Sequence, residues 1–201
     1  MRTIQIIGVV LVGVGCQETS VVESPSPRPA PMADANRVEP DQLSSAEHAQ
    51  WARAKAAKKE LAQALSTTLK AAVQEGDYAR GIEVCRGAAP EITAAVAGHP
   101  NLEIGRTAER LRNPNNRPPA WAAPWVARAE RQEVILRSEE GIRALFPIVL
   151  AEPCVHCHGS AGDIPDEVKG MLGKLYPEDR ATGFAPGDLR GWFWVEVNEE
   201  S

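Results

Sequence analysis

The sequence has few residues that could bind a metal or form a covalent link, with four cysteines and four histidines among 201 residues. It also lacks an excess of positive charge. The formal net charge is −5 and no basic stripe is visible, which argues against nucleic acid as a partner. There is no internal repeat. Charged residues at 24% and hydrophobic residues at 43% are ordinary for a globular domain that folds in water.

The N-terminus has the pattern of an export signal. A positive start, Met1-Arg2, precedes the apolar run Ile4–Gly15, which is too short to span a bilayer comfortably. Residues 1–15 are therefore predicted to be a secretory signal of the lipoprotein type. Cys16 follows the small Gly15 and is the predicted lipidation site, although Gly13 stands where such signals usually carry an aliphatic residue.

Ordinary signal cleavage nearby and an uncleaved anchor remain alternatives. All three readings place the rest of the chain outside the cytoplasm. We expect a membrane-anchored lipoprotein of the bacterial periplasm.

Residues 16–45 are predicted to be a disordered, Pro/Ser-rich tether, because five prolines stand there without helical or strand periodicity. The alternative is that part of this segment packs on the domain. Residues 46–201 are predicted to form one domain, which is long enough for a hydrophobic core.

Cys154-Val155-His156-Cys157-His158 has the spacing C-x-x-C-H, which is typical of c-type haem attachment. Each cysteine sulfur can add to one haem vinyl group, and His158 then lies where it can bind the iron as the proximal ligand. The predicted cofactor is one covalent haem. A zinc site and a redox dithiol are the alternatives for Cys154 and Cys157, but zinc sites usually have a second Cys or His pair, and this chain has none.

The second axial position has several candidates in the sequence. Cys85 has no evident disulfide partner, and a thiolate is a strong ligand for ferric iron. Met171 is also a candidate, since Met/His ligation is common in cytochromes c. His48, His99, water and an open site complete the alternatives.

The secondary structure is predicted to begin with helices and to end with strands. A long helix runs from about Ser45 to Glu75 with Ser44 or Ser45 as its cap, a short helix follows through Cys85, and another covers Glu91 to Ala97 after Pro90. Extended segments follow at residues 102–112, 133–150 and 191–197, with a short helix near Trp121 and Trp125. This order predicts an α+β domain.

The chain resembles a family of single-haem, PAS-like c-type cytochrome domains of bacteria. These domains occur in the periplasm and as sensor modules of histidine kinases. The resemblance covers about residues 50–200 and depends on these blocks: Ala79–Cys85 with Ala88-Ala89-Pro90; Ile104-Gly105-Arg106-Thr107; Leu111–Asn115 with Pro119 and Trp121; Cys154–Gly159; and Leu175–Pro177, Asp179, Ala181–Phe184, Gly187-Asp188 and Gly191.

The resemblance implies a PAS-like antiparallel sheet with flanking helices, and iron held between His158 and Cys85. Phe184 departs from the family pattern, where tyrosine is expected. Haem also carries two propionates, and arginine pairs well with carboxylates, so Arg106 and Arg112 are the candidate propionate partners.

An electron-transfer protein is the first functional hypothesis, since two protein ligands leave no open site on the iron. A haem-based redox or gas sensor is the second, and it would need a signalling partner protein. A haem-free structural lipoprotein is the third. We expect no enzymatic activity, because no distal acid–base pair is recognisable. The expected partners are a redox or signalling protein and a membrane, contacted through the N-terminal lipid.

Overall fold

A computed structural model describes residues 35–199 of the chain. The predicted signal, the lipidation site Cys16 and most of the predicted tether lie outside this range. Within it, none of the helices combines the length and the apolar character needed to cross a bilayer.

The first long helix is α1, Ser45–Ala72. Its cap is Ser44, whose hydroxyl accepts a hydrogen bond from the backbone N–H of Glu47, while the Glu47 carboxylate accepts one from the N–H of Ser44. This reciprocal pair satisfies two backbone donors that a helix start leaves free. The prediction of a helix with its cap at Ser44 or Ser45 is confirmed.

The second long helix is α2, Tyr78–Ala97, capped by Asp77. The prediction of two separate helices here is wrong, because Pro90 lies inside one continuous helix. Proline removes the N–H that would bond the carbonyl of residue 86, but Pro90 and Arg86 are both exposed to solvent. Buried residues before and after the proline hold the two halves in line.

Four strands form one antiparallel sheet: β1 Leu102–Thr107, β2 Val134–Arg137, β3 Gly141–Val149 and β4 Leu189–Asn198. The order across the sheet is β1-β4-β3-β2, so the last strand lies between the first and the third. The strands predicted within residues 133–150 and 191–197 are confirmed. The α+β class with an antiparallel sheet and flanking helices is also confirmed.

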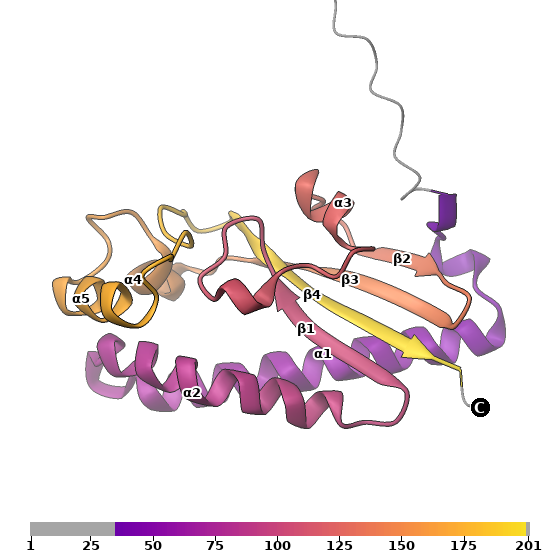
Figure 1. Cartoon of the computed structure of the whole chain (residues 1–201), viewed down its shortest axis with the longest axis horizontal. Coiled ribbons are helices and arrows are strands. Elements are labelled where there is room, and N and C mark those ends of the chain that lie inside the picture. The colour runs from indigo at the N-terminus through magenta and orange to yellow at the C-terminus, as the bar shows by residue number, and fades with distance from the viewer. Residues whose placement is uncertain (1–34, 200–201) are drawn as a thin grey trace, which may run out of the picture.

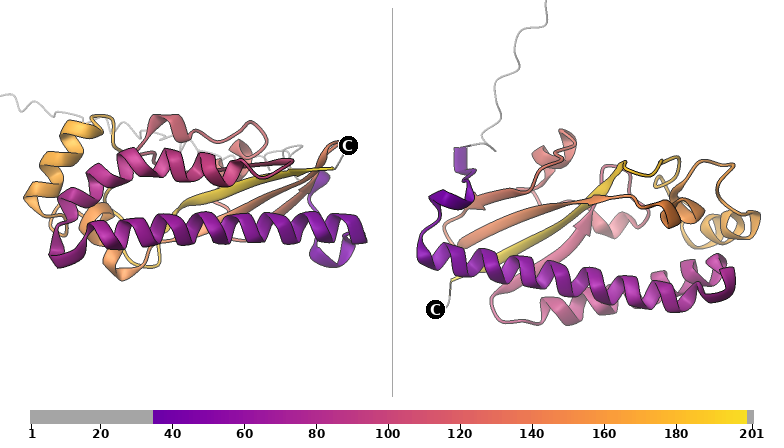
Figure 2. Two further views of the ribbon diagram at one scale, coloured as in Figure 1. Left: turned by 90° about the horizontal axis from the view of Figure 1, so that it is seen from below. Right: turned by 180° about the vertical axis from the view of Figure 1, so that it is seen from behind.

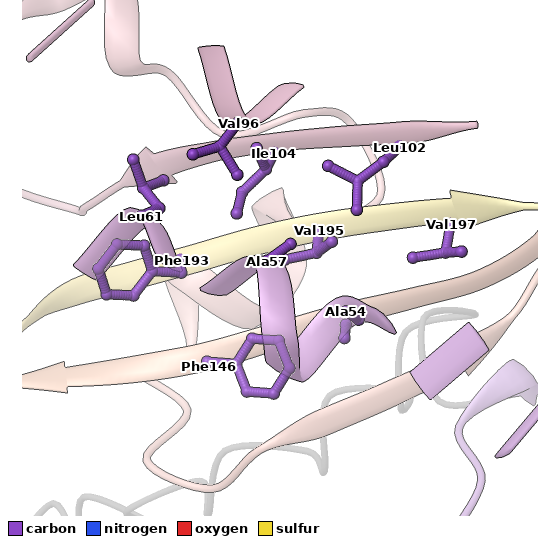
Figure 3. Packing of buried hydrophobic residues seen from close by; sticks show 11 residues of the cluster. Ala54, Ala57, Leu61, Val96, Leu102, Ile104, Phe146, Phe193, Val195 and Val197 are labelled. Carbon is purple, nitrogen blue, oxygen red and sulfur yellow. The ribbon is translucent and has the colours of Figure 1, made fainter. Parts of the chain in front are cut away.

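Two hydrophobic layers cover the sheet. α1 and α2 lie side by side along one face (Figure 2). Figure 3 shows Ala57 and Leu61 of α1 directed at Phe193 and Val195 of β4. The other face packs against α3, Ala123–Ala127, through Trp125. The alternation along β4 matches the predicted one, since Phe193, Val195 and Val197 face the helices and Trp192 faces α3.

The folded domain begins earlier than the predicted residue 46. Arg37 forms a β-bridge with Leu136, and the backbone N–H of Val38 donates to the carbonyl of Ile135. Val38 and Leu43 are buried against β2 and β3. Apolar residues among the prolines thus fix this part of the predicted tether to the sheet, with a short 3-10 helix at Pro40–Gln42.

The remaining short elements gather at the end of the molecule opposite the C-terminus (Figure 1). They are α4, Val155–His158, and α5, Asp166–Leu175. Helix α5 was not predicted. It is short and contains Gly170 and Gly173, which weaken the helical signal. Short 3-10 turns stand at Gln74–Gly76, Pro114–Asn116 and Glu152–Cys154.

Candidate functional site

The C-x-x-C-H residues form one compact turn after β3. The 3-10 turn Glu152–Cys154 leads directly into α4, which ends at His158. Gly159 follows, where a Cβ atom would stand 2.6 Å from the carbonyl oxygen of Val155 and 2.7 Å from the Cβ of Asp163. Only glycine leaves room for this tight exit. The turn therefore presents Cys154, Cys157 and His158 from a single helical turn.

The imidazole of His158 is held through its Nδ1 atom. Nδ1 lies 2.7 Å from the carbonyl oxygen of Ala181, which can only accept a hydrogen bond, so Nδ1 carries the proton. The lone pair of Nε2 is then free to bind a metal. Burial, and next the nearby charges of Arg112 and Arg190, hold the pKa of His158 well below its usual value, which keeps the ring neutral.

Residues 179–184 wrap around the same turn. The backbone N–H of Phe184 donates to the carbonyl of His158 at 2.9 Å, and the N–H of Gly183 donates to the carbonyl of Gly159. The Phe184 ring meets the His158 ring edge-on at 6.5 Å and carries the guanidinium of Arg110 on its face at 3.9 Å. Phe184 is buried and serves as an apolar support for His158.

Arg112 connects these two segments. Its guanidinium forms an ion pair with Asp179, with 3.1 Å between Nε and Oδ2, and donates to the carbonyls of Cys157 and Ala181. Arg112 therefore lies beside the C-x-x-C-H turn. Its predicted contact with a propionate stays a prediction, and its observed partners are protein groups.

Cys85 lies on α2, a helix that contacts α4. The pKa of Cys157 is raised to about 11, chiefly by burial, with a further contribution from the neighbouring Cys85. The pKa of Cys85 is itself raised by burial, while Arg106 and Arg112 oppose the shift. Cys85 is therefore close enough to Cys157 for the charges of the two sulfur atoms to interact.

The other candidate second ligands are separated by their positions. His48 is exposed near the start of α1, and exposed His99 pairs with Glu60 beyond the far end of α2. The start of α1 and the end of α2 both lie away from α4 (Figures 1 and 2). Met171 on α5 packs in the same apolar cluster as Cys157. Cys85 and Met171 are thus the two candidates close to the turn.

Two arginines next to the site form no ion pair with a carboxylate in the part of the chain that the structure describes. Within residues 35–199, neither Arg106 nor Arg190 forms an ion pair. Burial lowers the pKa of Arg106, and burial with the adjacent arginines lowers that of Arg190 to about 10. Arg190 was missed by sequence reasoning. Its signal is a charged residue at the second position of β4, directly before Gly191.

A stacked pair was also missed. The rings of Tyr78 and His156 lie parallel, 4.3 Å apart, and connect the start of α2 to the turn. No sequence pattern indicates this contact, since it joins residues far apart in the chain.

The cysteines in the described part of the chain form neither a disulfide nor a metal cluster. Cys85, Cys154 and Cys157 are all free thiols. Over the part of the chain that the structure describes, no cluster of three or more His, Cys, Asp or Glu side chains is arranged to hold a metal ion.

Comparison with known proteins gives a family and a structural relative. No protein with curated annotation is similar in sequence. The crystal structure of the cyanobacterial heme-protein Tll0287 is similar with a TM-score of 0.55 and 21% sequence identity, and the match covers 82% of this chain and 99% of that one. The model of the Tll0287-like family matches residues 37–198. The resemblance predicted from the sequence blocks is thereby confirmed, and the chain belongs to the Tll0287-like family.

Proposed function

We propose that this protein binds one haem covalently and works as a periplasmic electron-transfer cytochrome. The orientation of His158 is the observation that carries the proposal. Its Nδ1 proton is held by the carbonyl of Ala181, and its Nε2 is left free, at the end of a turn that also holds Cys154 and Cys157. A metal-binding histidine needs this arrangement. The heme protein Tll0287 supports the proposal as a structural relative.

The donor set of the turn suits haem. Cys154 and Cys157 would each add their S–H across one vinyl group, so that sulfur bonds to one carbon and hydrogen to the other. His158 would bind the iron through Nε2. The bound haem would supply a one-electron redox centre.

The surroundings of the turn suit the rest of the ring. The apolar side chains of α2 and α5 that pack with Cys157 would lie against the macrocycle. Arg106, which forms no ion pair within the described residues, would face a propionate. Arg112 also stays a proposed propionate partner. Its guanidinium already donates hydrogen bonds to Asp179 and to the carbonyls of Cys157 and Ala181.

Covalent attachment is tested with the double variant Cys154→Ser/Cys157→Ser. Expressed in cells with a working cytochrome maturation system, the unaltered protein should carry one haem on a denaturing gel, and its mass should include the tetrapyrrole. The double variant should carry none. A colourless unaltered protein would refute the proposal and favour a structural lipoprotein.

The second axial ligand is proposed to be Cys85, because α2 contacts α4 and places this thiol within electrostatic reach of Cys157. Cys85→Ser should change the visible spectrum of the ferric protein, while Met171→Leu should not. Thiolate favours ferric iron, so a low reduction potential is expected. The reverse result for the two variants would assign Met171 instead.

Sensing is the second candidate function, and one observation favours it. The proposed Cys85 ligand is carried by α2, whereas Cys154, Cys157 and His158 belong to the turn at α4, so the sulfur of Cys85 could leave the iron without detaching the haem. Carbon monoxide separates the two functions. Rapid binding by the reduced protein supports a sensor that acts on a partner protein, and lack of binding supports an electron carrier.

The cellular place is proposed from the N-terminal sequence. We infer that Cys16 is lipidated and that the domain works at a membrane surface outside the cytoplasm. Cys16→Ser should release the haem domain into the soluble periplasmic fraction. Membrane retention of that variant would contradict the lipid anchor. No enzymatic reaction is proposed.

A further inference from the structure

We propose that Arg112 and Asp179 are positioning residues that set the orientation and the tautomer of His158 toward the bound iron. This inference rests on the proposed function. Arg112 and Asp179 are called the bracket below, because they join the turn that ends at His158 to the segment that carries Ala181.

The bracket is an ion pair that is largely buried from solvent. The side chains of Arg112 and Asp179 are only 13% and 8% exposed, with 3.1 Å between Nε and Oδ2. The second carboxylate oxygen of Asp179 accepts a hydrogen bond from the backbone N–H of Ala181 at 2.8 Å. A single carboxylate therefore fixes both the guanidinium and the peptide at residue 181.

The guanidinium extends this hold to both sides of His158. It donates to the carbonyl of Cys157, the residue before the histidine, and at 3.4 Å to the carbonyl of Ala181. That Ala181 oxygen is also the acceptor for His158 Nδ1 at 2.7 Å. The bracket thus fixes the backbone from which the ring extends and the acceptor that orients it.

A second hydrogen-bonding group competes with the Ala181 carbonyl for Nδ1 of His158. Nε of Arg190 lies 3.3 Å from the same Nδ1 atom of His158. Nδ1 cannot donate to Ala181 and accept from Arg190 at once. If it accepted from Arg190, the ring proton would move to Nε2 and block the iron bond. By keeping the Ala181 carbonyl in place, the bracket favours the tautomer that can bind iron.

Charge acts in the same direction. The guanidinium groups of Arg112 and Arg190 both lie beside His158, and the carboxylate of Asp179 is paired with Arg112. Without the Asp179 carboxylate, the arginines would repel one another, and Arg190 would move relative to His158. Removing one partner of a buried pair leaves an uncompensated charge, which is costly.

The test compares three variants of the bracket with a matched pair elsewhere. Asp179→Asn and Arg112→Gln remove the charge. Arg112→Lys keeps it but cannot reach both carbonyls, because lysine has one donor centre in place of a planar fork. Arg143→Gln is the control, since Arg143 and Glu196 form an ion pair at 2.9 Å with 30% and 15% exposed side chains on the sheet.

The ferric electron paramagnetic resonance spectrum and the midpoint potential of each holoprotein are the readouts. All three bracket variants should show a second iron species with altered g-values and a shifted potential, and Arg143→Gln should show neither. Arg112→Lys should fold even where the charge-neutral variants do not, so the result stays readable.

Unchanged g-values and potential in the bracket variants that fold would overturn the inference. Equal changes in Arg143→Gln would overturn it as well, by showing a general effect of stability. A protein that carries no covalent haem at all would instead refute the proposed function, so the two failures are distinguishable.

Discussion

The helix-and-sheet body and the end that carries Cys154–His158 are held together by different kinds of contact. In the body, α1 and α2 bury alanine, leucine and valine side chains on a regular sheet. At the other end, hydrogen bonds from arginines and peptide N–H groups to backbone carbonyls join short helices and loops. Apolar packing tolerates small movements, whereas a metal ligand needs a fixed direction, and directional bonds supply it.

The largest expected effect is a loss of stability from a core substitution in the helix-and-sheet body, with no change at the haem site. Phe146 is 1% exposed between the sheet and α1, and Phe146→Ala should cost about 3–5 kcal/mol of unfolding free energy. Urea denaturation measures this. The haem spectrum of the folded fraction should not change. The control is Val149→Ala on the same strand, which is 57% exposed and should cost little.

The next effect concerns the other end. Gly159→Ala would place a Cβ atom 2.6 Å from the Val155 carbonyl, so the turn must shift, at an expected cost of about 1–3 kcal/mol. Because the shift lies beside His158, the yield of covalent haem should fall too, as read from pigment per protein. Gly162→Ala is the control, since its Cβ would meet nothing closer than 3.8 Å. Equal haem yields in Gly159→Ala and Gly162→Ala would contradict the claim that the end carrying His158 depends on a fixed backbone geometry.

The same difference explains what the sequence could predict. Helix α1, the strands and the alternation along β4 follow from periodic patterns, because regular packing requires a regular sequence. The C-x-x-C-H turn was found from its spacing. Pro90 misled the prediction, since its cost depends on whether the freed carbonyl meets solvent. The roles of Arg112 and Arg190 could not be predicted, because their partners come from segments far apart in the chain.

A smaller effect tests the cap of the body's first helix. Ser44→Ala removes the hydroxyl that accepts from the Glu47 N–H and should cost about 1 kcal/mol. Ser45→Ala, one residue inside the helix, should cost less, because no side-chain cap bond is lost. Thermal unfolding of the two variants measures the difference. A larger loss of stability in Ser45→Ala than in Ser44→Ala would contradict Ser44 as the cap.

The smallest effect depends on pH and lies in the same corner of the body. Hydrogen bonds from Arg137, and next from the Ser44 N–H, lower the pKa of Glu47 from 4.5 to about 2. A lowered pKa in the folded state stabilises the protein above the unfolded value, and this stability is lost as pH falls. Glu47→Gln should therefore be less stable than the unaltered protein at pH 7, and the difference should shrink between pH 4.5 and 2.

Glutamine keeps the capping pattern, so the pH-dependent part isolates the charge shared with Arg137. Added salt should reduce that part, because the Arg137 side chain is 45% exposed. The haem spectrum should stay constant across these variants, since the pair lies at the far end from α4. If the stability difference between Glu47→Gln and the unaltered protein persisted below pH 2, Glu47 would act through packing and not through its charge. Apolar packing would then account for still more of the stability of the body.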